Sequence, residues 1–331
     1  MFFTIFTVLF KAHGLHQSLV ELLGGVAHIT TYWYSIKAYL TGGTLNGGKM
    51  FNGGYGQTIT SYASDTMAVF NSQFGFDGYN DGSISTEDGS PPVDLSIRKA
   101  LNDGNSGKSI TKNGAGTVRS TVDFNGLKNH FKINAGTWYV DNPGEYGLGL
   151  QETKVSAGAK IGGIGCVGMK DVKSYATLEL SDGSEEKYAT IAPGTIDETT
   201  GEHIYGTFTS GRESAHNTLL MGKYSRLEIG VGPKNRETRV SKVDKLKVYG
   251  VLSIKENCTL DLVKNTAELD SIAGGVYTIV EADKIEGTFA SVLKPKDSWK
   301  VIYVTEGEGE DAVVKRIDVA IPGVGFKVFV R

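Results

Sequence analysis

The residues of this chain that are able to do chemistry are few and widely spaced. No histidine stands in an H-E-x-x-H or comparable metal-binding spacing, and no serine occupies a G-x-S-x-G turn. The six histidines are His13, His16, His28, His130, His203 and His216. We therefore predict no catalytic residue, no cofactor-binding residue and no metal ligand, and we expect that the protein is not an enzyme.

One glycine motif matches a nucleotide-binding pattern by its letters. Gly163, Gly165 and Gly168 satisfy G-x-G-x-x-G, which binds a pyrophosphate only where a strand precedes it and a helix follows it. Residues 169–180 are typical of polar residues that lead into another strand rather than of a helix. We therefore interpret these glycines as tight corners and predict no cofactor.

Residues Asp77 to Asp88 (DGYNDGSISTED) resemble an EF-hand or dockerin-type calcium loop. Gly82 takes the sharp-turn position six, Ile84 takes position eight and Asp88 supplies the carboxylate at position twelve. Tyr79 stands at position three, where the pattern requires Asp or Asn. A solvated Asp/Gly-rich turn is the preferred interpretation, and weak calcium binding remains the alternative.

Other polar and aromatic clusters have both a functional and a structural interpretation. The acidic residues Asp182, Glu185 and Glu186 and the run 306–311 are typical of solvated turns. Polysaccharide lyase or hydrolase chemistry would instead need carboxylates and a basic residue that converge from successive coils. The aromatic runs 138–139 and 32–34 are candidates for sugar stacking, but core packing is favoured for them. In a strand, Trp138 and Tyr139 point to opposite faces.

The two cysteines predict free thiols. Cys166 and Cys258 lack zinc-site spacing, and we interpret both as buried apolar residues. Their separation of 92 residues equals about four coils of ~20–25 residues, or ~20 Å at ~4.8 Å per coil. A disulfide requires Cα atoms within about 7 Å.

Composition excludes several classes of protein. Glycine, at 44 of 331 residues, is about twice its usual frequency, but it shows no collagen period. Hydrophobic residues make up 40% and charged residues 21%, so the chain is expected to fold. A net charge of -3 gives no field that would attract nucleic acid. The apolar run 1–10 is too short to span a bilayer, and we predict no membrane-spanning segment.

From about residue 41, short runs of β-branched or aromatic residues alternate with polar ones and are broken by Gly, Asn and Asp. This pattern predicts an all-β protein. The expected strands are 57–62, 93–97, 117–124, 131–140, 174–180, 227–231, 245–254, 259–263, 276–280, 301–304 and 325–330. In the aromatic-rich segment before them, residues 14–23 are compatible with a short helix that Gly24 and Gly25 end.

A recurring Gly-Thr-apolar phrase favours a stack of coils over a sandwich. It occurs at residues 43–45, 116–118, 136–138, 206–208 and 287–289, with a looser variant at 158–161. We expect each glycine to adopt a positive φ at a corner, and the next residues to start a strand whose apolar side chain points inward. Such coils bury their apolar sides only against their neighbours, as in a solenoid.

Residues 110–140 (ITKNGAGTVRSTVDFNGLKNHFKINAGTWYV) resemble the autotransporter-associated β-strand repeat of secreted passenger domains. The matching positions are Ile110, Lys112, Gly114, Gly116, Thr117 and Val118, then Asn125, Gly126, Ile133, Asn134, Gly136 and Thr137. Segments 155–168 and 191–194 are similar to the continuation of that pattern. Segment 244–252 resembles the paired strands that close many passenger stems, and 277–289 resembles a terminal coil.

The resemblance, which covers about residues 43–292, implies a right-handed parallel β-helix with a structural or adhesive extracellular role and no catalytic residues. We expect an ill-defined N-terminal segment (1–40), a solenoid (41–293) and a small C-terminal β cap (294–331). The sequence departs from the family at Arg119 and Ser120, and it shows no export signal and no C-terminal barrel strands. We therefore expect a fragment or a mis-started reading frame.

The predicted function is a stem at the cell surface or outside the cell, whose partners are the cell envelope, a host or matrix surface, or glycans. The alternative is a carbohydrate-active or glycan-binding β-helix protein, which should release sugar products or bind sugars. A truncated, nonfunctional reading frame is the third interpretation.

Overall fold

The computed structural model describes most of the chain in segments separated by short gaps. The described residues are 18–34, 36–51, 58–75, 81–99, 101–102, 109–124, 130–142, 144, 147–148, 152–168, 177–214, 216–235, 237–265 and 271–323. Within them there is no α-helix, and strands make up nearly all the regular structure. The all-β prediction is confirmed.

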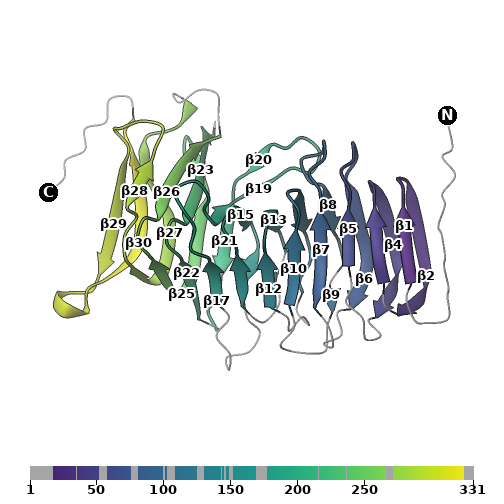
Figure 1. Cartoon of the computed structure of the whole chain (residues 1–331). Helices are drawn as coiled ribbons and strands as arrows, with labels where there is room; N and C mark the ends of the chain where they lie inside the picture. The colour runs from purple at the N-terminus through teal and green to yellow at the C-terminus, as the bar shows by residue number, and fades with distance from the viewer. Residues whose placement is uncertain are drawn as a thin grey trace.

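Most consecutive strands alternate between two long sheets that run the length of the molecule (Figure 1). Sheet A contains, in spatial order, β1 (Ser18–Leu22), β3 (Ile36–Leu40), β5 (Thr58–Ser61), β7 (Gly82–Thr86), β10 (Ser109–Asn113), β12 (His130–Ile133), β14 (Thr153–Val155), β17 (Thr177–Leu180), β22 (Asn217–Met221), β25 (Lys245–Ile254), β27 (Gly275–Glu286), β30 (Val313–Ile321) and β29 (Lys300–Glu306). β16 (Cys166–Val167) and β21 (Thr207–Ser210) pair beside this row.

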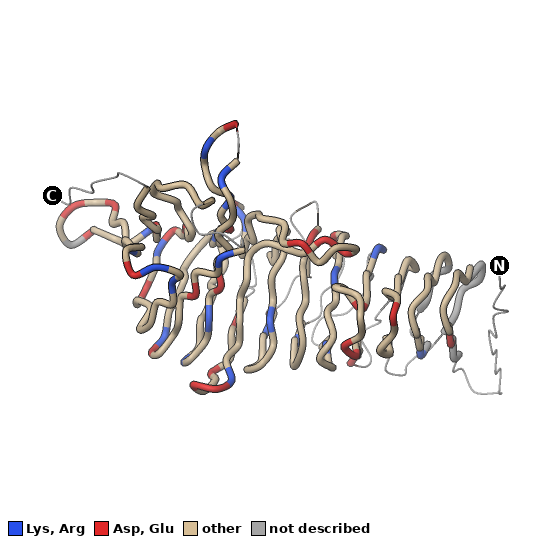
Figure 2. Tube along the Cα trace, turned by 90° about the horizontal axis from the view of Figure 1, so that it is seen from above, with Lys and Arg blue, Asp and Glu red and all other residues tan. Residues whose placement is uncertain are grey.

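Sheet B contains β2 (Val26–Tyr34), β4 (Gly43–Phe51), β6 (Ala68–Gly75), β8 (Leu95–Ile97), β11 (Thr117–Ser120), β13 (Gly136–Val140), β15 (Ala159–Gly163), β18 (Thr190–Pro193), β23 (Arg226–Lys234), β26 (Thr259–Lys264) and β28 (Ser291–Leu293). β9 (Leu101–Asn102) pairs with β6, and β24 (Ser241–Val243) pairs with β23. The main path of sheet B is parallel throughout, and the coils lie side by side as successive loops of one tube (Figure 2). This arrangement is consistent with a solenoid.

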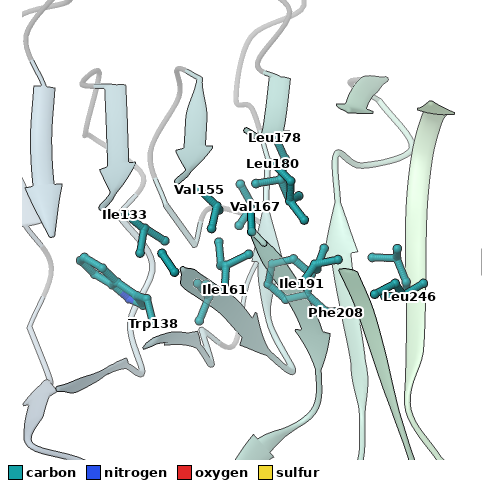
Figure 3. Close-up of a cluster of buried hydrophobic side chains, with 14 of the residues drawn as sticks. Ile133, Trp138, Val155, Ile161, Val167, Leu178, Leu180, Ile191, Phe208 and Leu246 are labelled. Carbon is teal, nitrogen blue, oxygen red and sulfur yellow. The ribbon is translucent and has the colours of Figure 1, made fainter. Parts of the chain in front are cut away.

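The core is a set of ladders in which one residue per coil stacks on its counterpart in the next. In sheet B one ladder consists of Leu95, Val118, Trp138, Ile161, Ile191, Leu227, Leu260 and Val292. All but Val292 are fully buried. Side chains from both sheets meet in the space between them (Figure 3). Alternation along each strand produces this pattern, because every second side chain points inward.

The expected glycine corners are confirmed in part. Gly43, Gly136, Gly158 and Gly287 have positive φ, but Gly116 and Gly206 do not. At Gly116 the reason is close packing, since a Cβ would lie 2.3 Å from the carbonyl oxygen of Glu87 on the preceding coil. The apolar residue after each of the five Gly-Thr pairs is buried, although no strand starts at Gly287.

Three expectations about elements were wrong. Residues 18–22 form β1, which pairs with β3, rather than a helix. Residues 131–140 hold two strands, β12 and β13, because Gly136 turns the chain between the sheets. The expected strand 245–254 is confirmed as β25. Its two halves pair with β21 and β22, so the resemblance of segment 244–252 to two paired strands was wrong.

The two ends of the stack differ. The described sheets begin at β1 and β2, within the segment for which no definite structure was expected. Parallel pairing ends at β28, after which β30 pairs antiparallel with β27, and β29 pairs antiparallel with β30. No helix in the described part of the chain has the length and apolar character to cross a membrane.

Candidate functional site

A short two-stranded hairpin leaves the coils and crosses the outer face of sheet B. It is formed by β19 (Thr195–Ile196) and β20 (His203–Ile204), and we call residues 195–204 the arm (Figure 1). Glu198 in the arm forms ion pairs with Arg98 at 2.8 Å and with Arg119 at 3.2 Å. Arg98 directly follows β8, and Arg119 lies in β11. The arm therefore spans several coils.

Asp141 anchors the start of the arm. Its buried carboxylate accepts a hydrogen bond from Thr195 Oγ1 at 2.6 Å and pairs with Arg119 Nε at 2.5 Å. Arg119 is thus shared between Asp141 and Glu198. This departure from the repeat pattern at Arg119 therefore has a structural role, since it ties the arm to the sheet.

The other end of the arm places His203 against a buried carboxylate. His203 Nε2 lies 2.7 Å from Asp244 Oδ2, although the two residues are 41 positions apart. Asp244 stands just before β25, its side chain is fully buried, and it also accepts hydrogen bonds from the backbone N–H groups of Gly206 and Gly230. Burial raises the pKa of Asp244, while the hydrogen bond from His203 opposes that rise.

Three glycines leave the space that this pair and its neighbour occupy. A Cβ on Gly194 would lie 2.6 Å from both Asp244 Oδ1 and His203 Nε2, and a Cβ on Gly230 would lie 2.4 Å from Asp244 Oδ2. A Cβ on Gly232 would lie 2.2 Å from the hydroxyl of Tyr205. The outer face of sheet B is therefore shaped to receive these side chains.

The ring of Tyr205 packs edge-on against His203, with ring centroids 4.7 Å apart. Burial, together with the charge of Asp244, raises the pKa of Tyr205 to about 12, so its hydroxyl stays protonated and can donate to the carbonyl of Asn265 at 3.4 Å. Beside the two rings is an open pocket of about 430 Å³, a size within the ~300–1,000 Å³ range of small-molecule sites. It is lined by His203, Ile204, Tyr205, Gly206, Thr207, Lys242 and Val243.

A second polar cluster lies on the same face of sheet B. Lys160 in β15 pairs with Glu228 in β23 at 2.5 Å, and Arg226 pairs with Asp261 in β26 at 3.2 Å. The guanidinium of Arg226 also lies 3.8 Å above the ring of Tyr188. Glu228 and Asp261 are directly paired across neighbouring strands.

The ionisation of this second cluster follows from burial and from these charges. Burial raises the pKa of Asp261, the positive charge of Arg226 opposes the rise, and the negative charge of Glu228 adds to it. Each carboxylate has its own cation, so the cluster is neutral as a whole. Carboxylates and basic residues do converge here from successive coils, which the sequence left open.

The calcium-loop interpretation does not fit residues 81–88, the described part of that segment. Asp81 and Asp88 flank the extended strand β7, which pairs with β5 and β10. At ~3.3 Å per residue their Cα atoms are roughly 20 Å apart, too far to bind one ion together. Asp81 instead accepts a hydrogen bond from the N–H of Ser109. Residues 77–80 lie outside the described residues.

The glycine motif and the acidic runs have structural positions. Gly163 ends β15, and the N–H of Gly165 donates to the carbonyl of Val140; residues 169–176 lie outside the described part. Asp182, Glu185 and Glu186 are exposed in a turn, as expected, and Asp182 accepts a hydrogen bond from the N–H of Lys223.

The expected burial of Trp138 and of both cysteines is confirmed. The cysteines are separated by three strand intervals of sheet B, from β15 to β26, rather than by the expected four coils. Trp138 is fully buried and Tyr139, on the opposite face, is half-buried. Cys166 and Cys258 are both buried free thiols. The side chains of residues 32–34 lie outside the described part.

No protein-family model matches the chain, and no curated protein matches it. The resemblance to autotransporter-associated repeats therefore stays a prediction.

Sequence reasoning missed His203 and Asp244 as a pair. His203 carried no metal or catalytic spacing, and Asp244 was assigned only to a closing strand. The one local signal is the pair of glycines at 230 and 232, which interrupts an alternating strand. A glycine inside a strand often marks the close approach of another group.

Proposed function

We propose that the protein is a right-handed parallel β-helix that serves as a stem of an autotransporter-like surface protein, outside the cell and without catalysis. The observation that supports this most is the unbroken ladder from Leu95 to Val292, in which each coil stacks one residue on its counterpart in the next and all but Val292 are fully buried. A solenoid of this kind is stabilised along one axis. Its length and stiffness suit it to hold another surface away from its anchor.

The dimensions of the described stack fit a spacer. Eleven strands lie on the described path of sheet B, and ten intervals of ~4.8 Å amount to about 50 Å. The antiparallel strands β29 and β30 then cover the last parallel strand of sheet A. We propose that they act as a cap, because an uncovered sheet edge invites pairing with other chains.

Small-angle X-ray scattering of the purified chain tests the stem itself. A rod-like profile with a cross-section that stays constant along the long axis is expected. A globular profile would contradict the proposal, and so would a rod-like profile that is seen only when the protein aggregates. The partner of the stem would be the cell envelope or a host or matrix surface.

The alternative is a carbohydrate-active β-helix, and the cluster around Glu228 and Asp261 is the observation that favours it. Two carboxylates from adjacent coils, with Lys160 and Arg226, offer the groups that glycoside cleavage uses. Assays for reducing ends and for unsaturated products on acidic and neutral polysaccharides test it. Turnover that Glu228→Gln and Asp261→Asn abolish would replace the stem proposal, whereas no turnover is the result we expect.

A further inference from the structure

We propose that the pocket beside His203 is a binding site for an anionic sugar, one that carries a carboxylate or a sulfate. The inference goes beyond the stem function and does not depend on where the protein is located. It rests on how three pocket residues, His203, Tyr205 and Lys242, are held and on what each can offer to a ligand.

His203 is held so that one ring nitrogen is available. Nε2 is occupied by Asp244 at 2.7 Å, and within the described part of the chain Nδ1 has no hydrogen-bond partner. When Nε2–H donates to Asp244, the neutral ring presents Nδ1 as an acceptor. A sugar hydroxyl is a suitable donor for it. The hydroxyl of Thr207, which also lines the pocket, adds a group that can donate or accept.

The walls of the pocket suit a pyranose ring. Tyr205 and His203 are packed edge to face, and Ile204 is a partly exposed apolar side chain beside them. Apolar and aromatic walls with a few fixed polar groups are typical of small-molecule sites. His203 is held rigidly, because its partner Asp244 is fully buried and accepts hydrogen bonds from three donors.

Lys242 decides the charge of the ligand. It is exposed in β24 and lines the pocket, and its ammonium has no ion-pair partner among the described residues. The lysine on the neighbouring surface, Lys160, is already paired with Glu228. An unpaired ammonium beside hydroxyl-binding groups favours a sugar that bears a negative charge.

The test measures binding of four probes to the full chain by ligand-observed NMR: glucuronate, glucose 6-sulfate, glucose and a simple carboxylate, acetate. Glucuronate or the sulfated sugar is expected to bind about tenfold more tightly than glucose, and acetate should not compete. The two anionic probes distinguish a carboxylated from a sulfated ligand.

Three variants locate the site. Lys242→Ala should lower the affinity for the anionic sugars to that for glucose. His203→Gln should lower the affinity both for the anionic sugars and for glucose. Lys255→Ala is the matched control, because this exposed lysine follows the far end of β25, roughly 35 Å along the strand from Asp244. Equal affinity for glucose and both anionic sugars, binding unaffected by Lys242→Ala, or no binding of any sugar at millimolar concentration would overturn the proposal.

Discussion

The ammonium of Lys112 donates a hydrogen bond to the carbonyl oxygen of Ala135, on the next coil, at 2.8 Å. Lys112 stands in an inward-facing ladder of sheet A, paired with Ile84 on one side and Ile133 on the other. Its ammonium also donates to the carbonyls of Gly114 and Gly116, each at 2.6 Å. A fully buried lysine thus joins two corners of the stack.

The first prediction concerns these three hydrogen bonds. Lys112→Met keeps the aliphatic stem but leaves three carbonyl oxygens without their donor, and we expect the free energy of unfolding to fall by about 2 kcal/mol. Lys132→Met, an exposed site on the neighbouring strand, is the control and should change it by less than ~0.5 kcal/mol. If urea titrations gave the same unfolding free energy for Lys112→Met and Lys132→Met, the three hydrogen bonds of Lys112 would contribute nothing to stability.

The second prediction is that Lys112 makes the unfolding free energy depend on pH. Burial lowers the pKa of Lys112 from 10.5 to about 8, and the charges of Asp94 and Asp88 oppose the change. Between about pH 8 and 10.5 the unfolded chain therefore binds more protons, so this group makes the folded state more stable as pH rises. The difference in unfolding free energy between wild type and Lys112→Met should grow by up to roughly 3 kcal/mol over that interval. A pH-independent difference would contradict the assignment.

The third prediction concerns the core ladder. Trp138 is fully buried between Val118 and Ile161, and its indole N–H donates to Ser120 Oγ at 3.0 Å. Trp138→Ala should lower the unfolding free energy by about 3–5 kcal/mol, because it leaves a large cavity. Tyr62→Ala, at a partly exposed ring, should cost much less. Calorimetry that ranks the two variants the other way would place Trp138 outside the core.

The fourth prediction concerns the space around His203 and Asp244. Gly194 and Gly24 both have positive φ, but a Cβ on Gly24 would meet nothing within 4 Å. Gly24→Ala should therefore cost only the backbone strain of about 1–2 kcal/mol, whereas Gly194→Ala should cost at least ~1 kcal/mol more. Gly194→Ala should also shift the ring resonances of His203 in NMR spectra. An unchanged His203 spectrum would mean that the pair is not packed against Gly194.

The sequence was sufficient for the all-β class and for part of the strands and core, because the alternation of apolar and polar residues is a local feature. Trp138 and Tyr139 were placed on opposite faces for that reason. The helix expected at 14–23 was wrong since pairing with β3 outweighs the local pattern of Ser18–Leu22. Long-range pairing of this kind is not visible in a single segment.

The site was out of reach for a different physical reason. His203 meets Asp244 only because the arm folds across sheet B, and Glu198 meets Arg98 across 100 residues of sequence. These meetings depend on the lengths of the coils between the residues, and the coils vary in length. The departure at Arg119 was noticed in the sequence, but its partners Asp141 and Glu198 are set by the fold.

The proposed stem has to lie on the outside of a cell, since it holds another surface away from its anchor. The most direct measurement is labelling of intact source cells with a membrane-impermeant, amine-reactive reagent, followed by mass spectrometry of the protein. We predict that exposed lysines such as Lys99 and Lys255 are labelled in intact cells to the same extent as after lysis. Labelling that occurs only after lysis would overturn the stem proposal, since a stem that is enclosed by the cell cannot hold anything away from its surface.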